Sequence, residues 1–368
     1  MTTISELETI LNISRPEDVF RDLWIWGTGN TAEMLQEGLK RWDRFSQIKG
    51  YVDSNPQKAG KTFYGKPIVS PETIKNEPNA CVLICTNQSN YLAEIKEQLQ
   101  NMGDVHWYVL EDFVLYDLRK RVLDTFKLFE DDKSKELFSY LVKCKKNGEY
   151  PSSDSGLLDI EHGYFSMPEF AQKDDNEVFV DVGCYIGDTI EEYLSVKGNS
   201  FKKIYSFEPD PVSFEKAKEN VKRLCEELSV DLEKISILPY GVGGKTETGV
   251  FERFEESEGT GSKFVTGKSS DEESLTKIVA LDDFIEEGFS FLKADVESYE
   301  YQVIMGASKT IQKCKPKMAI CLYHNVFDFI QLPGIIKDLV PDYRLYLRQH
   351  AASWFDTVVY AVEKAQPY

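Results

Sequence analysis

Two acidic residues flank two glycines in the stretch FVDVGCYIGDT, which spans residues 179–189. An apolar run that reads as a strand ends near Asp181, and Gly183 and Gly187 lie in the turn that leads into a helix. In open α/β sheets a ligand binds at this edge, and glycines let it approach the backbone. Asp188 in the first helical turn would repel a phosphate group, which a helix N-terminus otherwise attracts. The loop therefore predicts a ligand that carries positive charge and lacks phosphate.

A second carboxylate, Glu208, follows the next apolar run, in SFEPDP. One strand–helix–strand length separates Asp181 from Glu208, so both should face one ligand, and an acid in the second position can bind both ribose hydroxyls. S-adenosylmethionine, with its sulfonium and ammonium groups, suits these surroundings. The alternatives are a solvated acid at Glu208 and a helix cap at Asp181. The residues predicted to contact this cofactor are Asp181, Gly183, Cys184, Tyr185, Gly187, Asp188, Glu208 and Asp295.

Candidate groups for an acceptor substrate follow two later strand-like runs, in LKADVE and CLYHN. Asp295 follows the first run, and Tyr323 and His324 follow the second. Asp295 and His324 are the predicted catalytic residues, because such groups can bind an acceptor hydroxyl and remove its proton. Asp295 could instead only organise its loop, and His324 could be a structural histidine. His350 is a further candidate at the same mouth, and Glu297 could cap the following helix.

The elements that must position these residues alternate between strands and helices over residues 173–368, which predicts a mostly parallel sheet covered by helices. The last two strand-like runs, YRLYLRQ and DTVVYAVE, are joined by a connection too short for a parallel crossover. We therefore expect a class I methyltransferase-like Rossmann fold, an α/β domain with a seven-stranded sheet whose last strand is antiparallel. The polar segment 252–275 is rich in glycine and serine and is expected to be a long loop.

Residues 1–110 show a smaller strand–helix alternation, which predicts a small Rossmann-like α/β domain with about four or five strands. It contains G-x-G-x-x-A, with Gly27, Gly29 and Asn30 in the turn and Asp53 at the end of the next strand. This is the arrangement of a nucleotide site, with a scaffold or dimerisation surface as the alternative. Apolar residues at helical spacing in 111–172 predict a connector with two helices.

The chain has 43 basic and 62 acidic residues among 368, a net charge of −19. This charge repels phosphate backbones and anionic membranes, so we expect no nucleic-acid partner and no membrane insertion. Seven cysteines show no paired spacing and the N-terminus has no secretory pattern, which favours reduced thiols in the cytoplasm. The oligomeric state, including a homodimer, is left open.

The motifs FVDVGCYIGDT, IYSFEPDP, KIVALDDFI, FLKADVESYEYQVIMGA and DTVVYAVE together resemble the FkbM-type methyltransferases over about residues 173–368. That family is a class I, S-adenosylmethionine-dependent group that mostly methylates hydroxyls of sugars, polyketides and related acceptors. The resemblance implies cofactor contacts by Asp181, Gly183 and Glu208. It also implies that Asp295 and Glu297 line the cleft.

Two departures from the family pattern concern the acceptor side. Ser298 stands where the family usually has a glycine after D-V-E, and Gln349–His350 replaces a histidine pair. The implied reaction is an in-line displacement on the methyl carbon, with the acceptor oxygen held behind the methyl group and His324 or Asp295 as base. No ligand cluster with a characteristic spacing predicts a metal.

The block WIWGTGNTAEMLQEGL to SPETI, within residues 21–110, resembles the small Rossmann-like domain at the front of sugar acyltransferases and other nucleotide-sugar enzymes. We therefore predict O-methylation of a sugar, nucleotide-sugar or glycan hydroxyl. One alternative is an NAD-dependent sugar-nucleotide oxidoreductase that uses the first glycine loop, weakened by the lack of a suitably placed Tyr-x-x-x-Lys pair. Another is a non-enzymatic module that binds nucleotide-sugars.

Overall fold

The computed structural model describes residues 4–11, 22–77, 80–86, 88–103, 105–160, 163–253, 262–265 and 275–364. The chain divides into two compact units. The first comprises Met1–Phe126, Phe138–Tyr150 and Asn325–Ile330, and the second comprises Lys127–Leu137, Pro151–His324 and Gln331–Tyr368. The domain boundaries after residues 110 and 172 stay a sequence-based prediction.

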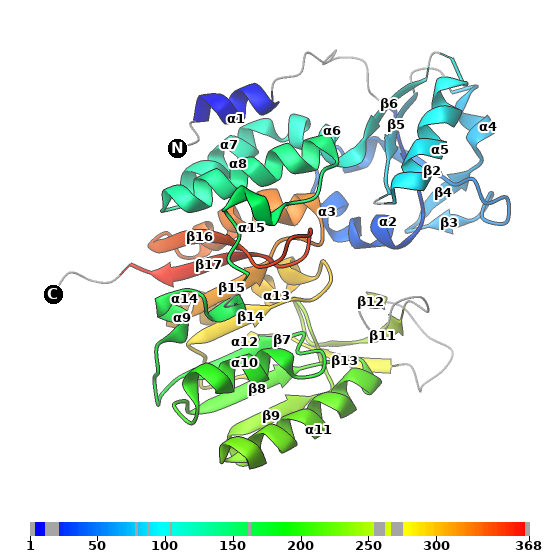
Figure 1. The fold of residues 1–368 in the computed structure, drawn as a ribbon. Helices are drawn as coiled ribbons and strands as arrows, with labels where there is room; N and C mark the ends of the chain where they lie inside the picture. Colours follow the sequence, from blue (N-terminus) through cyan, green and yellow to red (C-terminus); the bar gives the residue numbers. More distant parts are fainter. Residues whose placement is uncertain are drawn as a thin grey trace. The chain divides into compact units, whose positions relative to one another are not determined.

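The sheet of the first unit has six strands in the order β3-β4-β2-β1-β5-β6 (Figure 1). Neighbouring strands are parallel except β3 and β4, which form a hairpin. Tyr64 and Gly65 turn this hairpin with φ of 48° and 76°, as a two-residue hairpin loop requires. We expected four or five strands, which is too few. The hairpin strand β3 is so short that its sequence shows no alternation of apolar and polar residues. The strands are β1 (Asp22–Trp26), β2 (Ile48–Val52), β3 (Thr62–Phe63), β4 (Lys66–Val69), β5 (Ala80–Ile84) and β6 (His106–Val109).

Three helices, not the predicted two, occupy the region after β6. The first of the two predicted helices is interrupted at Leu118. Helix α7 ends where Phe129 forms a bridge to Leu345 and the Glu130 N–H donates to the Leu345 carbonyl at 2.8 Å. Residues 129–131, next to this pairing with β16, therefore separate α7 from the following helix. Asp131 accepts from the Ser134 N–H where that helix begins. The helices up to residue 147 are α1 (Ile4–Leu11), α2 (Asn30–Met34), α3 (Gln36–Lys40), α4 (Pro71–Ile74), α5 (Ser89–Gln100), α6 (Leu110–Asp117), α7 (Arg119–Leu128) and α8 (Asp132–Asn147).

The main sheet of the second unit has seven strands in the order β16-β17-β15-β14-β7-β8-β9. Strand β17 is antiparallel to both neighbours and the other pairs are parallel, which confirms the expected fold. Residues 350–356 alone connect β16 to β17, so no parallel crossover is possible. The strands are β7 (Val178–Val182), β8 (Lys203–Phe207), β9 (Ile235–Leu238), β14 (Phe291–Ala294), β15 (Lys317–Cys321), β16 (Tyr343–Gln349) and β17 (Thr357–Glu363).

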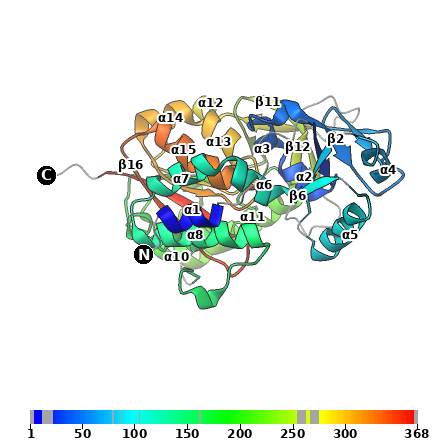
Figure 2. The same cartoon turned by 90° about the horizontal axis from the view of Figure 1, so that it is seen from above.

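Helices cover both faces of this sheet, with α10 and α11 on one face and α12 to α14 on the other (Figure 2). Every residue of β7 is buried, as expected for a central parallel strand. Phe179 stacks on Tyr193 and Phe291, with centroids 4.7 and 4.5 Å away. The helices are α9 (Pro168–Ala171), α10 (Asp188–Lys197), α11 (Pro211–Leu228), α12 (Leu281–Phe284), α13 (Glu300–Gly306), α14 (Ser308–Cys314) and α15 (Val326–Leu339).

A small second sheet has the order β10-β13-β11-β12. Its strands are β10 (Gly241–Val242), β11 (Glu247–Arg253), β12 (Ser262–Val265) and β13 (Leu275–Val279). The expectation of one long loop over 252–275 is therefore wrong in part, because β12 pairs with β11 within that segment. Residues 254–261 and 266–274 lie outside the described residues.

Candidate active site

The glycine loop after β7 is held from both sides at the carboxyl edge of the main sheet. The N–H groups of Gly183 and Cys184 both donate to the carbonyl of Phe207, at 3.0 and 3.1 Å. Gly183 has a φ of +78°, and a Cβ there would lie 1.9 Å from the carbonyl oxygen of Asp295. Only glycine therefore fits between the ends of β8 and β14, which explains its place in the motif.

A buried ion pair lies directly beneath this loop. Asp181 is fully buried inside β7, and its Oδ1 is 3.2 Å from the Nζ of Lys293, its register partner on β14. Lys293 also donates to the carbonyl of Gly183 at 2.7 Å. Burial works against the charge, but the carboxylates of Asp181 and Asp295 raise the pKa of Lys293, which keeps its proton. Cofactor contact by Asp181 stays a prediction, whereas its contact with Lys293 is visible.

Glu208 follows β8 and turns its carboxylate toward the glycine loop. Its Oε2 accepts from the Tyr185 N–H at 2.9 Å, and its Oε1 accepts from the Asp210 N–H at 2.8 Å. Burial is the main influence and raises the pKa of Glu208 to about 7, although these two N–H groups oppose it. Each oxygen still has a lone pair for a further donor. The structure thus brings Gly183, Tyr185 and Glu208 together, as the sequence predicts.

The other predicted cofactor residues differ in exposure. Cys184 is fully buried, so only its backbone can face a ligand. Gly187, with a φ of +89°, precedes the first residue of α10. That first residue, Asp188, is exposed. Contact of these three residues with the cofactor remains a prediction.

Asp295 is the hub of a polar cluster on the acceptor side. Its Oδ1 accepts from the Tyr323 hydroxyl at 2.8 Å, and its Oδ2 accepts from the Tyr164 hydroxyl at 3.2 Å. Burial would raise the pKa of Asp295, but His324, Lys293 and the two hydroxyls hold it below its usual range. Tyr164, in a 3-10 turn over Gly163–Phe165, was missed, because nothing in its surrounding sequence marks it.

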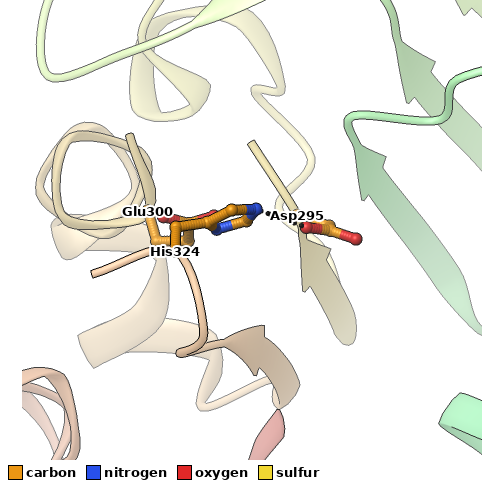
Figure 3. Close-up of side chains that lie close together, drawn as sticks. All are labelled: Asp295, Glu300 and His324. Carbon is orange, nitrogen blue, oxygen red and sulfur yellow. Dashed lines mark ion pairs between the residues drawn. The ribbon is translucent and has the colours of Figure 1, made fainter. Parts of the chain in front are cut away.

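His324 lies between carboxylates on both sides of its ring (Figure 3). Its Nδ1 is 2.8 Å from Glu300 Oε1, and its Nε2 is 3.3 Å from Asp295 Oδ1 and 3.6 Å from Glu297 Oε2. Burial lowers the pKa of His324, yet the three carboxylates outweigh it and raise the pKa to about 10. The predicted pairing of Asp295 with His324 is present in the structure. Glu300 was missed, although its place five residues after Asp295 could have suggested it.

Glu297 and His350 make contacts that their surrounding sequence did not indicate. Glu297 does not cap α13, whose N-cap is Tyr299, and it approaches His324 instead. His350 is a satisfied histidine, with its Nδ1 2.7 Å from the Asp159 carbonyl oxygen and its Nε2 2.8 Å from the Tyr360 hydroxyl. Both ring nitrogens of His350 are thus engaged within the fold, and burial lowers its pKa.

The outer edge of the acceptor cluster carries an exposed aromatic ring. Phe355, in the connection between β16 and β17, is 64% exposed. Its ring meets that of Tyr323 edge-on, with centroids 5.7 Å apart. An apolar surface therefore adjoins the buried polar groups around Asp295, as in sites that combine apolar walls with a few placed polar groups.

Asp53, at the predicted nucleotide site of the first unit, is hydrogen-bonded to neighbouring groups of that unit. Asp53 accepts from the Thr28 hydroxyl, from Lys58 Nζ at 3.1 Å and from the Asn55 N–H at 2.9 Å. Burial would raise the pKa of Asp53, but these donors lower it.

The glycines of that site differ in the space around them. A Cβ on Gly27 would lie 2.5 Å from the Cys85 carbonyl oxygen, whereas Gly29 has open space, and Asn30 begins α2. Nucleotide binding by Gly27, Gly29, Asn30 and Asp53 stays a prediction.

Comparisons with known proteins match both parts of the chain. Residues 181–353 match the family model described as methyltransferase FkbM domain. Residues 21–106 match the model described as C2185-like, N-terminal, and the resemblance of this part to sugar acyltransferase domains is not confirmed. The comparison with curated protein sequences gives no significant match. Within the described part of the chain, no helix is long and apolar enough to cross a membrane.

Several solved structures are similar to this chain. A methyltransferase FkbM from Methylobacillus flagellatus KT covers 93% of this chain and 90% of its own, at 20% identity and a TM-score of 0.54, which shows a shared fold. The match to an rRNA methylase from Streptococcus thermophilus covers 53% of this chain and 90% of the methylase, at 13% identity and a TM-score of 0.32. A Streptococcus mutans protein described as a methyltransferase, in complex with S-adenosylhomocysteine, covers 52% and 91%, at 14% identity and a TM-score of 0.32.

The tight packing of the glycine loop predicts that Gly183→Ala destabilises the protein. Gly156→Ala is the matched control, because Gly156 also has a positive φ but has open space around it. The control should lose about 1–2 kcal/mol from the left-handed backbone alone. Gly183→Ala should lose a further ~1–3 kcal/mol, because its Cβ must displace the Asp295 carbonyl. Urea unfolding followed by circular dichroism measures both, and equal losses would contradict the packing argument.

At Ser298 a substitution is expected to stabilise the protein. Its φ is +75°, which explains the family's glycine at this place, and its buried hydroxyl has no hydrogen-bond partner among the described residues. Ser298→Gly should therefore stabilise the protein by about 1–2 kcal/mol, since it removes both defects. Ser229→Gly, at an exposed residue with a φ of 54°, relieves only the backbone and should gain less. A lower urea midpoint for Ser298→Gly than for the wild type would refute this account.

Proposed function

Because residues 181–353 form an FkbM methyltransferase domain, we propose that this chain transfers a methyl group to a hydroxyl of a sugar, nucleotide-sugar or glycan. The domain is a methyltransferase, and S-adenosylmethionine is its cofactor. The finer assignment, oxygen as the methylated atom and a sugar as acceptor, is supported chiefly by Asp295, a carboxylate held by two tyrosine hydroxyls beside an exposed aromatic ring.

The residues after β7 and β8 fit S-adenosylmethionine. Glu208 offers two carboxylate oxygens, each oriented by one backbone N–H, to the two ribose hydroxyls. Lys293 lies beside the glycine loop, where it pairs with Asp181 and donates to the Gly183 carbonyl. Its charge is therefore already balanced and does not attract phosphate. Asp188 adds an exposed carboxylate that suits a cationic ligand. When bound, the cofactor supplies an electrophilic methyl group on its sulfonium.

The acceptor-side residues can bind and orient a hydroxyl. The side chain of Asp295 is 23% exposed, and its two oxygens are fixed by Tyr164 and Tyr323. A remaining lone pair on Asp295 can accept the hydrogen bond of an acceptor hydroxyl and take up its proton at a carboxylate oxygen. Correct placement of that hydroxyl is the main contribution that this cluster makes to the rate.

Phe355 favours a sugar among the possible acceptors. Its exposed ring provides a flat apolar surface next to Tyr323, and a sugar ring presents an apolar C–H face together with hydroxyls at its rim. A purely charged acceptor would gain little from this surface. The acidic net charge of −19 also disfavours a nucleic acid, so the absence of such a partner, like a cytoplasmic location, remains our expectation.

The direct test is methyl transfer from radiolabelled S-adenosylmethionine to a panel of free sugars, nucleotide-sugars and oligosaccharides. We expect a methyl ether on one acceptor class, identified by mass spectrometry, and a fall of at least about 100-fold in kcat for Asp295→Asn, in line with loss of a positioned base. Asp342→Asn, at an exposed carboxylate of the same unit, is the control and should keep full activity. Transfer exclusively to nitrogen or carbon would refute the proposal.

Glu208 predicts a pH-dependent affinity for S-adenosylhomocysteine. Below its pKa of about 7 the Glu208 carboxyl is protonated and loses the charge that accepts from the ribose, so affinity should rise from pH 6 to pH 8. Glu208→Gln should bind about tenfold or more weakly at pH 8, because a hydrogen bond to a charged group is lost, and its affinity should not change with pH. Glu226→Gln, at an exposed residue of α11, should keep the wild-type profile in calorimetry. A flat wild-type profile would contradict this assignment.

A further inference from the structure

An excess of negative charge gathers around the buried ring of His324. Three carboxylates, those of Asp295, Glu297 and Glu300, lie within 3.6 Å of its ring nitrogens. The side chains of His324 and Glu300 are 1% and 0% exposed. One imidazolium can balance only one of these charges, and Lys293 is already paired with Asp181. Enclosed charges of one sign are costly unless they are paired or bind a metal ion.

Polar atoms of the same residues have no hydrogen-bond partner among the described residues. Both ring nitrogens of His324 and the Oε2 of Glu300 are buried and make no hydrogen bond of acceptable geometry. The ring nitrogens of His324 thus lie only 2.8 Å from Glu300 and 3.3 Å from Asp295, but at angles that do not suit a hydrogen bond. Each such buried atom costs about 1–3 kcal/mol if nothing satisfies it.

We infer that Asp295, Glu300 and His324 bind one divalent transition-metal ion. These residues come from the end of β14, the first turn of α13 and the end of β15, and one ligand atom from each lies within 4.8 Å of the others. An ion about 2.0–2.2 Å from each ligand atom needs these atoms at most about 4.4 Å apart, so a small inward movement completes the site. Glu297, 3.6 Å from His324 Nε2, is a third carboxylate within reach.

The surroundings of these ligands resemble those of metal-binding side chains. Asp295 is oriented by two tyrosine hydroxyls, and Glu300 Oε1 accepts from the Val296 N–H at 2.8 Å. Such outer hydrogen bonds fix carboxylate ligands in metal sites.

The donor set indicates which ions should bind. One imidazole with two carboxylates suits Zn²⁺ or Mn²⁺, whereas Mg²⁺ and Ca²⁺ prefer oxygen ligands throughout. We therefore expect tighter binding of Zn²⁺ and Mn²⁺ than of Mg²⁺.

The role of the ion rests on the proposed function. Asp295 is the partly exposed member of the cluster and lies on the acceptor side, so an open coordination position there would face the acceptor oxygen. A metal-bound hydroxyl loses its proton more readily than a free one. The ion would then share with Asp295 the task of activating the acceptor.

The test is calorimetric titration of the chelator-treated full chain with Zn²⁺, Mn²⁺ and Mg²⁺, together with electron paramagnetic resonance for Mn²⁺. We expect one saturable site for Zn²⁺ and Mn²⁺. His324→Gln and Glu300→Gln should each weaken it at least about tenfold, a typical loss for a metal site. His106→Gln, at an exposed histidine of the first unit, should bind as the wild type does. Circular dichroism confirms that each variant is folded.

The outcomes separate this inference from the proposed function. No saturable binding, or binding that survives both cluster variants, overturns the metal site. In that case S-adenosylhomocysteine binding and methyl transfer in chelator would leave the proposed function intact. One metal per chain without methyl transfer to any hydroxyl keeps the metal site and refutes the acceptor assignment. Glu300→Gln keeps the shape of the side chain, so a loss of metal with an unchanged melting temperature supports direct ligation.

Discussion

The buried pair of Asp181 and Lys293 fixes the geometry on which the site depends. The two residues face each other across β7 and β14, and Lys293 extends past Asp181 to the carbonyl of Gly183. Removing either partner would leave an uncompensated buried charge, which typically costs about 3–5 kcal/mol. The pair therefore ties the glycine loop to the neighbouring strand, and it does so with a cation that remains unavailable to phosphate. A charged residue inside a buried strand is here a structural requirement of the cofactor loop.

The order of elements and the edge that carries the site could be predicted from the sequence, because both follow from local patterns. Apolar runs followed by acids placed Asp181, Glu208 and Asp295 at adjacent strand ends, and the short link before DTVVYAVE required a reversed last strand. The roles within that edge were harder to predict. Whether Asp181 faces a ligand or a lysine depends on the register of β7 with β14, which no local pattern reveals.

Two features of the fold were not predicted. The first of the two expected connector helices is divided at Leu118 into α6 and α7, and no pattern in the surrounding sequence marks that break. His350 looks like a site residue in sequence, yet the carbonyl of Asp159 and the hydroxyl of Tyr360 engage both of its nitrogens. The contacts of His350 are long-range, and only the folded chain supplies them.

Asp295 belongs to both halves of the site, and this has a consequence for how the site can be dissected. Its N–H donates to the carbonyl of Val182 at 3.0 Å and its own carbonyl packs against Gly183, while its side chain binds Tyr323 and faces His324. The backbone of one residue thus supports the cofactor loop while its carboxylate serves the acceptor side.

A substitution at Asp295 can therefore disturb both functions through one element. Glu208 and Glu300 each accept a hydrogen bond from a different backbone N–H group, that of Tyr185 and that of Val296. Changes at these two positions can separate cofactor binding from acceptor chemistry, because neither carboxylate contributes to the contact between Gly183 and Asp295.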